Sequence, residues 1–345
     1  MHPNFIRAAV LALSLSIIAI LSWEFHLRHK GHSLTYDDNE ALWADKRAMV
    51  YDPTDKTTVF IGSSRIKYDL DIPTWRAITG KDAIQLANVG SSPRAVLTDL
   101  ANDTNFKGNV VVDVTEGTFF SEFAFYDGST NKKIAYYHNR TPTQRFSFQV
   151  NHVLESQFVF LDQDWFSING MVDNIPIPPR PGVYPGPQFP MGFTPVNYDR
   201  QNIMTPDFVA DTNQHNAVKG IWAYGLNQPF DSLSREKLDG IFNSVKRDAD
   251  KIKARGGQVF FVRTPSSGLF WAKESKWYPR AAYWDRLLAL TGCKGIYFTD
   301  YPATNHFDCP EWSHLTPADA VIYTKAFIQE LQEKEWPSKN ISISQ

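Results

Sequence analysis

Short apolar runs alternate along this chain with longer amphipathic segments, and this alternation constrains the fold more than any other feature. The apolar runs lie at residues 57–61, 84–89, 109–115, 258–263 and 295–300. Helical spacing of apolar residues extends to about residue 79 and recurs at residues 94–103, 234–255, 279–291 and 317–334. Strands that alternate with helices across short loops predict a parallel sheet with right-handed crossovers. We therefore expect a three-layer α/β/α sandwich with a central parallel sheet.

The composition is that of an ordinary globular protein. The chain has 345 residues, of which 43% are hydrophobic and 21% charged, enough for one large domain or two small ones. Its formal net charge is −2, and it has no basic stripe with interleaved aromatic residues. Such a chain has no electrostatic footprint for nucleic acid, so nucleic acid is not an expected partner.

The N-terminus departs from this soluble composition. Residues 8–23 carry no charge, and with Phe5 and Ile6 the apolar stretch at 5–23 approaches the roughly 17 to 20 residues that cross a bilayer. No small-x-small cleavage site follows cleanly, because Trp23, Glu24 and Phe25 are bulky. A cleaved secretion signal stays open as an alternative. We expect a retained anchor with its flank at residues 1–30, and a body at residues 31–345 outside the cytoplasm.

A stretch at about residues 120–231 interrupts the alternation of strands and helices. At residues 175–187 it reads Ile-Pro-Ile-Pro-Pro-Arg-Pro-Gly-Val-Tyr-Pro-Gly-Pro, which suits neither a helix nor a central strand. We expect an irregular, proline- and glycine-rich insertion within the α/β domain. Because active-site loops leave the carboxyl ends of strands in such sheets, we expect it to cover or border the site. A surface loop, a lid and a partner-docking segment all remain open.

The two cysteines, Cys293 and Cys309, both lie late in the chain. An even number of cysteines outside the cytoplasm is compatible with a disulfide, and two buried free thiols are a second interpretation. Neither cysteine has metal-ligating residues near it at a useful spacing. We therefore expect no metal site and no cofactor.

A serine at a strand-to-helix turn and an acid–histidine pair are the parts that a serine acyl enzyme needs. Ile61-Gly62-Ser63-Ser64 ends the first strand, where backbone N–H groups and the helix dipole stabilise an oxyanion. Gly90 follows the second strand and is a candidate for another N–H donor. Near the other end of the chain, Glu311 precedes His314 by three residues. His314 is the candidate base, and Glu311 the acid that orients its imidazole.

These segments resemble sequence blocks of the SGNH (GDSL-like) hydrolases over roughly residues 55–335. Gly62-Ser63-Ser64 resembles the first block, with Ser64 at the nucleophile and Ser63 where aspartate is common. Asn88-Val89-Gly90 resembles the second block, whose glycine N–H serves the oxyanion hole. Glu311-Trp312-Ser313-His314 resembles the last, with glutamate in place of the usual aspartate. The resemblance implies a flavodoxin-like α/β/α fold and catalysis by Ser64, His314 and Glu311.

The third block departs from the pattern of that family. Where the family has Gly-x-Asn, this chain has Val114-Thr115-Glu116-Gly117-Thr118, so the oxyanion-hole asparagine has no clear counterpart. Thr115 or Glu116 is a candidate to line the pocket there, and a structural role for either is an alternative.

Three other assignments stay open on the sequence. Asp308 competes with Glu311 as the orienting acid, and Ser63 competes with Ser64 as the nucleophile. Arg65 and Arg263 are candidates to bind substrate oxygens, although Arg65 could instead neutralise Asp69 or Asp71, and Arg263 could form a surface ion pair. The Tyr198-Asp199-Arg200 segment has no assignment.

Serine chemistry of this kind forms an acyl-enzyme and passes the acyl group to water or to another hydroxyl. Anchored extracytoplasmic members of the family resemble O-acyltransferases that decorate cell-surface polysaccharide. The resemblance therefore implies a periplasmic body, a carbohydrate or acyl-ester substrate, and a multi-spanning membrane acyltransferase as partner. A plain esterase or lipase is the first alternative. A catalytically silent polysaccharide-binding or assembly protein is the second.

Overall fold

A computed structural model describes residues 3–51, 57–122, 124–175, 182, 188–230 and 232–337 of this chain. Its centre is a parallel five-stranded sheet with the order β2-β1-β3-β4-β5. The chain forms β1 first, adds β2 on one side of it and then adds β3 on the other side. The topological switch point therefore lies between β1 and β3. The strands are β1 (Thr57–Ile61), β2 (Asp82–Gln85), β3 (Asn109–Asp113), β4 (Gln258–Arg263) and β5 (Lys294–Tyr297).

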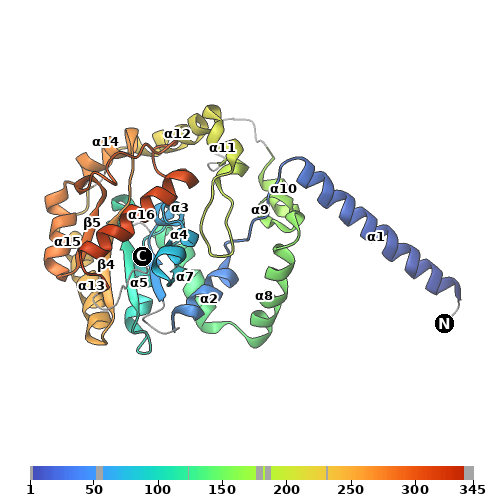
Figure 1. Cartoon of the computed structure of the whole chain (residues 1–345), viewed down its shortest axis with the longest axis horizontal. Coiled ribbons are helices and arrows are strands. Elements are labelled where there is room, and N and C mark those ends of the chain that lie inside the picture. Colours follow the sequence, from blue (N-terminus) through green and yellow to red (C-terminus); the bar gives the residue numbers. More distant parts are fainter. Residues whose placement is uncertain are drawn as a thin grey trace. The chain divides into compact units, whose positions relative to one another are not determined.

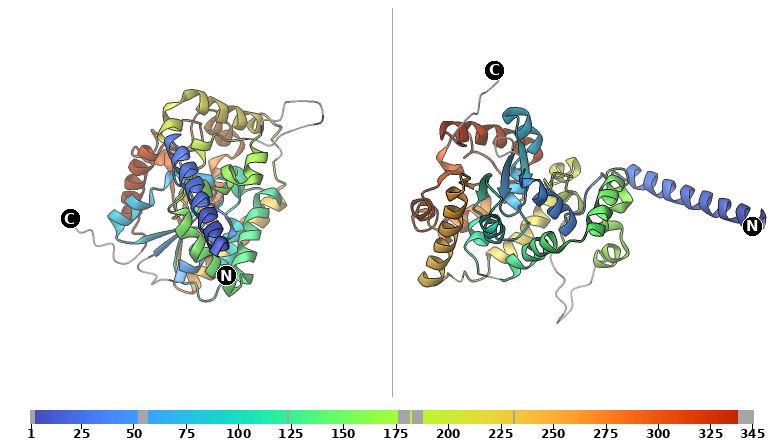
Figure 2. Two further views of the ribbon diagram at one scale, coloured as in Figure 1. Left: turned by 90° about the vertical axis from the view of Figure 1, so that its right-hand side faces the viewer. Right: turned by 90° about the horizontal axis from the view of Figure 1, so that it is seen from below.

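Side chains of the central strands alternate between two apolar clusters, one on each face of the sheet. In β1, Val59 and Ile61 join one cluster while Phe60 joins the other, as the two-residue period of a strand requires. The first face is covered by α5 (Arg94–Asn102), α13 (Arg235–Ala254) and α15 (Trp284–Thr291). The second is covered by α3 (Ser64–Asp69), α4 (Ile72–Thr79) and α16 (Pro317–Glu333). The sheet lies between α13 and α16 in Figures 1 and 2, so the predicted three-layer α/β/α sandwich is confirmed.

Several element boundaries differ from the prediction by a few residues. The helix expected to run to residue 79 is two helices, because Leu70 has an extended backbone and the Asp71 side chain caps a new helix by accepting Thr74 N–H. Residues 86–89 were predicted as strand, but β2 ends at Gln85. The chain beyond it still follows β1, since Leu86 N–H bonds to Phe60 O. At the other edge, the 3-10 helix η5 (Phe298–Asp300) replaces the end of the predicted fifth strand.

The expectation of an irregular insertion at residues 120–231 is wrong for most of its described part, which is helical. Proline and glycine concentrate at residues 175–187, of which all but 175 and 182 lie outside the described residues. The flanking segments carry good helix-capping residues, such as Asp162, Ser167, Thr205 and Asp211, whose side chains accept first-turn N–H groups. The helices are α7 (Ala124–Asn139), α8 (Pro142–Glu155), α9 (Gln163–Phe166), α10 (Ile168–Asp173), α11 (Pro206–Ala210) and α12 (Thr212–Leu226), with η2 (Val159–Leu161) and η3 (Met191–Phe193).

Contacts within the chain define two compact units. The N-terminal unit comprises Met1–Asp37 and Pro142–Gln188, and the α/β unit comprises Asp38–Thr141 and Phe189–Gln345. The predicted insertion is therefore divided between them. The α/β unit also contains α2 (Glu40–Ala48), η1 (Met49–Tyr51), α6 (Glu116–Phe119), α14 (Gly268–Trp277) and η4 (Arg280–Ala282).

The N-terminal unit begins with the long apolar helix α1 (Pro3–His29). Its segment Asn4–His29 has a mean hydropathy of 2.2 over its most apolar window, and that window is fully exposed. Among the described residues, this is the one helix long and apolar enough to cross a membrane. It contains the predicted anchor at residues 5–23. Its length and composition suit either a membrane span or a signal sequence.

The two cysteines are free thiols. Cys293 packs against the cluster on the α13 face of the sheet, whereas Cys309 belongs to the cluster on the α16 face. A disulfide, one of the two interpretations that the sequence left open, is therefore not formed, because the sheet separates the two sulfur atoms.

Candidate active site

The turn after β1 presents Ser64 at the carboxyl edge of the sheet. Ser64 is the first residue of α3 and is partly exposed. Gly62 makes the turn possible, because a Cβ atom there would lie 2.6 Å from Asp113 Cβ and 2.7 Å from Ile66 Cγ2. The ends of β1 and β3 approach too closely for any side chain at this position.

Ser64 and His314, 250 residues apart in the chain, are in direct contact. The distance between His314 Nε2 and Ser64 Oγ is 2.8 Å. On the other side of the ring, His314 Nδ1 lies 3.0 Å from Glu311 Oε1. With Nδ1–H donating to the carboxylate, Nε2 is left to accept the serine proton. The three predicted catalytic residues thus form one hydrogen-bonded chain.

The Glu311 carboxylate is held by its own loop and by one residue from a distant helix. Oε1 also accepts the backbone N–H groups of Ser313 at 3.1 Å and His314 at 2.6 Å. Oε2 accepts the indole N–H of Trp222 in α12. Burial by itself raises the pKa of the Glu311 carboxyl, but the His314 charge and the hydrogen bonds from His314 and Trp222 outweigh it. The pKa therefore lies below its usual 4.5, and Glu311 is ionised where it orients the imidazole.

A strained turn aims this acid at the histidine. Trp312, between Glu311 and His314, has a left-handed backbone with φ 79°, which is uncommon for a bulky residue. Its N–H donates to Cys309 O at 2.9 Å, and its carbonyl accepts Ser267 N–H at 2.9 Å. Such strain persists only where neighbouring structure holds it, and it concentrates at functional sites.

An aromatic wall surrounds the His314 ring. Tyr68 lies 4.3 Å from it, Phe193 5.6 Å and Trp222 6.3 Å, measured between ring centroids. Phe193 and Trp222 come from the segment between β3 and β4 that we expected to border the site. Sequence reasoning did not identify them. The capping Asp211 and the apolar spacing in residues 212–226 were the signal for the helix that carries Trp222.

The second predicted block lies beside the serine turn. Asn88 N–H donates to Gly62 O at 3.2 Å, so Gly90 follows two residues after a direct contact with this turn. Gly90 has φ 64°, a conformation that favours glycine, and a Cβ atom there would have no neighbour within 4 Å. Ser63 makes no capping hydrogen bond to the first turn of α3. The oxyanion role of the Gly90 N–H stays a prediction.

The third block offers no substitute for an oxyanion-hole asparagine. Thr115 Oγ1 donates to Asp113 Oδ2 at 2.9 Å. Its hydroxyl proton is therefore already used in a hydrogen bond within the protein. Glu116 Oε1 accepts Arg263 Nε at 3.1 Å and is buried. Thr115 is half-buried, and its place at a substrate pocket stays a prediction, while Glu116 belongs to a buried ion-pair network.

The prediction that Arg65 and Arg263 bind substrate does not fit this structure, because both guanidinium groups are buried and share one carboxylate. Arg65 Nη2 lies 2.7 Å from Glu274 Oε1, and Arg263 Nη2 lies 2.6 Å from Glu274 Oε2. Arg65 Nε also donates to Ser313 Oγ at 3.3 Å, which ties the residue after the nucleophile to the histidine loop. Arg263 therefore forms a buried ion pair and not the surface one considered from the sequence, and Arg65 pairs with Glu274 instead of Asp69 or Asp71. Glu274, in α14, had no motif around it and was missed.

Geometry also separates the rival assignments. Asp308 is exposed and makes no hydrogen bond to His314, whereas Glu311 does. Ser63 is buried and lies at the N-cap of α3, whereas Ser64 Oγ reaches the imidazole. The arrangement favours Glu311 over Asp308 and Ser64 over Ser63.

Arg200, left unassigned from the sequence, supports the Asn88–Gly90 loop. Its buried guanidinium donates to Gln85 O at 2.8 Å, Ala87 O at 3.0 Å and Asn88 Oδ1 at 3.0 Å. Asp38 accepts from Arg200 Nε at 2.5 Å and neutralises it. Because one side chain binds three acceptors in the segment after β2, it fixes the path of the loop that carries Gly90.

A second buried carboxylate, Asp69, lies behind the His314 loop and differs from Glu311. Its Oδ1 accepts Leu315 N–H at 3.0 Å, and Oδ2 has no hydrogen-bond partner among the described residues. Burial, with the charges of Asp113 and Glu311, raises the Asp69 pKa well above 3.8, against the Leu315 hydrogen bond and Arg65. Two neighbouring carboxyl groups are thus driven to opposite protonation states.

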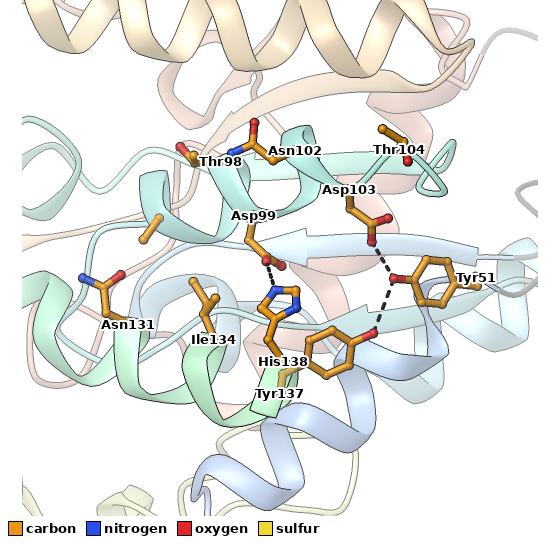
Figure 3. Close-up of a pocket in the computed structure, with 11 residues that line it drawn as sticks. Tyr51, Thr98, Asp99, Asn102, Asp103, Thr104, Asn131, Ile134, Tyr137 and His138 are labelled. Atoms are coloured by element: carbon orange, nitrogen blue, oxygen red, sulfur yellow. Dashed lines mark hydrogen bonds and ion pairs between the residues drawn. The ribbon is translucent and has the colours of Figure 1, made fainter. Parts of the chain in front are cut away.

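A pocket of about 730 Å³ in the α/β unit is lined by residues of α5 and α7, with Tyr51 and Thr104 beside them (Figure 3). His138 Nε2 lies 2.6 Å from Asp99 Oδ1, and Tyr51 Oη donates to Asp103 Oδ2. Both carboxylates also pair with the buried Arg47. The polar groups satisfy one another, and no hydroxyl nucleophile contacts the imidazole among the described residues. This arrangement is that of a structural ion-pair network.

Among the residues that the structure describes, no group of three or more histidine, cysteine, aspartate or glutamate side chains is placed to hold a metal ion. Comparisons with known proteins add no name to this geometry: no protein-family model matches the chain, and no curated protein matches it significantly.

Proposed function

We propose that this chain is a serine acyl enzyme of the SGNH type. The observation that carries the proposal is the hydrogen-bonded chain from Ser64 Oγ through the His314 imidazole to Glu311. A serine activated by a histidine whose second nitrogen is held by a buried carboxylate is the arrangement that recurs in acyl-transfer enzymes of unrelated folds. The reaction follows from the roles of these groups.

In the first half-reaction, His314 Nε2 takes the Ser64 proton as Oγ attacks the carbonyl carbon of an ester. The tetrahedral intermediate carries a negative oxygen, which the N–H groups at the start of α3 and the Gly90 N–H are positioned to receive in this proposal. The intermediate then expels the leaving alkoxide, which takes the proton from His314. Ser64 is left acylated. In the second half-reaction, His314 removes a proton from an acceptor hydroxyl that attacks the acyl-enzyme and frees Ser64.

We infer that the acyl group is transferred to, or removed from, a carbohydrate hydroxyl at the cell surface. The support is the resemblance of the three sequence blocks together with an N-terminal helix that is able to span a membrane. In this proposal α1 stays in the membrane, the α/β unit lies on the extracytoplasmic side, and a multi-spanning membrane acyltransferase supplies the acyl group.

A fluorophosphonate probe tests the nucleophile directly, since it labels activated serines only. We expect labelling of the wild-type chain, none of Ser64→Ala, and retained labelling of the matched control Ser63→Ala. Loss of labelling in Ser63→Ala alone would move the nucleophile to Ser63. A folded protein that resists the probe would contradict the enzyme assignment and favour the silent binding protein.

A second assay separates transfer from hydrolysis. The acyl-enzyme formed from p-nitrophenyl acetate is followed by intact mass, with and without soluble polysaccharide as acceptor. Faster loss of the acyl group with acetylated glycan as product supports transfer. Loss to water alone, at a rate that glycan does not change, supports the plain esterase.

A further inference from the structure

The exposed apolar side chains of this protein are unevenly distributed. Sixteen large hydrophobic residues outside α1 are exposed among the described residues, and nine of them belong to the N-terminal unit, the smaller of the two. Single exposed apolar residues are normal on any protein, but a concentration of them marks an interaction surface. These nine are Leu34, Phe146, Val150, Val153, Leu154, Ile168, Met171, Val172 and Ile175.

Seven of the nine form two helical stripes. On α8 the exposed residues are Phe146 and the residues 4, 7 and 8 positions after it. On α10 they are Ile168, at 82% exposed, and the residues 3 and 4 positions after it, and the exposed Ile175 follows two residues beyond the end of the helix. Both spacings put the side chains on one face of a helix. Each helix therefore presents an apolar face that the N-terminal unit does not bury.

Hydrogen bonds attach this region to α1 where its apolar stretch ends. Glu24 is the first charged residue after the predicted span, and its carboxylate accepts the N–H groups of Val159 at 3.0 Å and Phe160 at 3.2 Å. Arg28, one turn further, donates to Gln157 O at 2.8 Å. The end of α1 adjoins the α8–α10 region in Figures 1 and 2. A bilayer that contains residues 5–23 would therefore have its headgroup layer beside η2.

We propose that α8 and α10 lie in the membrane interface, with their apolar faces in the boundary between headgroups and acyl chains. This proposal rests on α1 being inserted in a bilayer, as the proposed function assumes. Amphipathic helices bind that boundary when they have a continuous apolar face and polar flanks. The first turn of α8 precedes the apolar stripe and ends at the exposed Arg145. The positive charge of Arg145 would be attracted to anionic lipid headgroups.

Lipid is favoured over a protein partner because the segment between the two stripes, residues 157–160, is hydrogen-bonded to the end of α1 just after its apolar stretch. Because α1 tethers the N-terminal unit to the bilayer, α8 and α10 are held at a high effective concentration next to it. Each helix therefore needs only a weak affinity for lipid. In consequence the N-terminal unit is a broad base on the membrane rather than a single flexible stalk.

Depth-dependent fluorescence quenching tests this on the full chain. Bimane is attached to single cysteines at Phe146, Val153, Ile168 and Met171, in a background where Cys293 and Cys309 are replaced by serine and alanine. The protein is reconstituted in phosphatidylcholine–phosphatidylglycerol nanodiscs, and quenching by doxyl-labelled lipid is compared with quenching by aqueous iodide. Bimane at Leu13 reports insertion of α1, and bimane at Ile322 in the α/β unit is the exposed control.

We expect doxyl lipid to quench the α8 and α10 positions at least threefold more than Ile322, with iodide showing the opposite order. Iodide quenching at these positions equal to that at Ile322 would overturn the proposal. Protection from both quenchers would also overturn it, because protein would then cover the stripes. If Leu13 is not quenched by lipid, α1 is outside the bilayer and the proposal fails with it.

The same measurements on Ser64→Ala separate this inference from the proposed chemistry. Lipid quenching should be unchanged in this variant, whatever the outcome of probe labelling. The double variant Val150→Glu/Met171→Glu should reduce lipid quenching of bimane at Phe146 while fluorophosphonate labelling at Ser64 is retained in detergent.

Discussion

The α/β unit contains two histidine–carboxylate pairs, one at the carboxyl edge of the sheet and one between α5 and α7, and they differ in whether a serine contacts the histidine. At the carboxyl edge, His314 contacts Glu311 on one nitrogen and Ser64 on the other, and its side chain is 2% exposed. Between α5 and α7, the pair between His138 and Asp99 is shorter, at 2.6 Å, and the histidine side chain is 53% exposed.

The difference between the pairs lies in their surroundings. Among the residues that the structure describes, no arginine pairs with Glu311, so its charge acts on His314, whereas the charge of Asp99 is shared with Arg47. His138 also has no serine on its second nitrogen among the described residues. A close histidine–carboxylate contact is therefore common to structural and catalytic sites. Burial, an unshared carboxylate and a nucleophile at hydrogen-bond distance separate the two.

Replacing each histidine by alanine is the most severe way to break this comparison. His314→Ala removes the only base in contact with Ser64 among the described residues, so we expect esterase activity to fall by about 10⁴-fold or more. His138→Ala should change activity less than about twofold. The measurement is initial hydrolysis of p-nitrophenyl acetate, with circular dichroism as the control for folding. Comparable losses in both variants would contradict the assignment.

The two acids of the histidine loop sharpen the comparison further. Glu311→Gln keeps the shape but lets an amide face Nδ1, which disfavours the productive tautomer, so we expect roughly a 10²- to 10⁴-fold loss in kcat. Asp308→Asn should leave kcat within about twofold, because Asp308 is exposed. A larger loss in Asp308→Asn than in Glu311→Gln would reverse the assignment.

Arg200 tests whether the carboxyl edge depends on a preorganised loop. Arg200→Met removes the guanidinium donor from the carbonyl oxygens of Gln85 and Ala87, whereas Asp38 keeps Lys67 at 2.5 Å and Asn88 Oδ1 keeps Lys133 at 3.1 Å. A buried acceptor left unpaired costs about 1–3 kcal/mol. We expect about a tenfold fall in kcat with little change in KM, because the Gly90 loop acts on the transition state. Arg200→Lys, which retains the charge, should recover part of kcat. Rates equal to wild type in folded Arg200→Met would show that this loop does not contribute.

Replacing Asp69 by asparagine is expected to affect the free energy of unfolding, in a way that depends on pH, and to have the smallest effect of these changes. The pKa of Asp69 is raised on folding, so the folded state holds a proton that the unfolded state releases above about pH 4. The contribution of Asp69 to the free energy of unfolding is therefore greatest below that pH, and it declines as the pH rises toward the folded-state pKa. Asp69→Asn should therefore be more stable than wild type at pH 7, with a difference that grows by at most about 1.4 kcal/mol per pH unit.

Urea unfolding of both proteins at pH 4, 5, 6 and 7 measures this difference. A constant difference across these values would mean that Asp69 titrates normally in the folded protein. Glu311, whose pKa is lowered, has the opposite dependence: its contribution is present above about pH 4.5 and declines below it.

The layered fold followed from local patterns because strand and helix periodicities are properties of neighbouring residues. The runs at 57–61, 109–113 and 258–263 are apolar on consecutive positions, which suits strands buried on both faces. The helices of residues 124–226 were missed because the proline-rich run at 175–187 dominated the composition of that region. Its flanks carry ordinary capping residues that were not weighed separately.

The catalytic candidates Ser64, Glu311 and His314 were accessible from the sequence because each sits in a short block whose spacing has a chemical reason. The roles of Arg65, Arg263 and Arg200 were not accessible. A guanidinium group near a sheet edge binds substrate or a buried carboxylate equally well. Which of these it does depends on partners such as Glu274 and Asp38, far away in the chain.

The sequence by itself determined the parallel α/β sheet, the apolar N-terminal helix and the serine, histidine and acid that are candidates for catalysis. These depend on short-range spacing, and spacing can be seen in a linear chain. Tertiary structure alone decided that Glu311 rather than Asp308 meets His314, that Trp222 completes its carboxylate, and that two arginines are buried around Glu274. Such choices depend on burial and on hydrogen bonds between residues that only folding brings together.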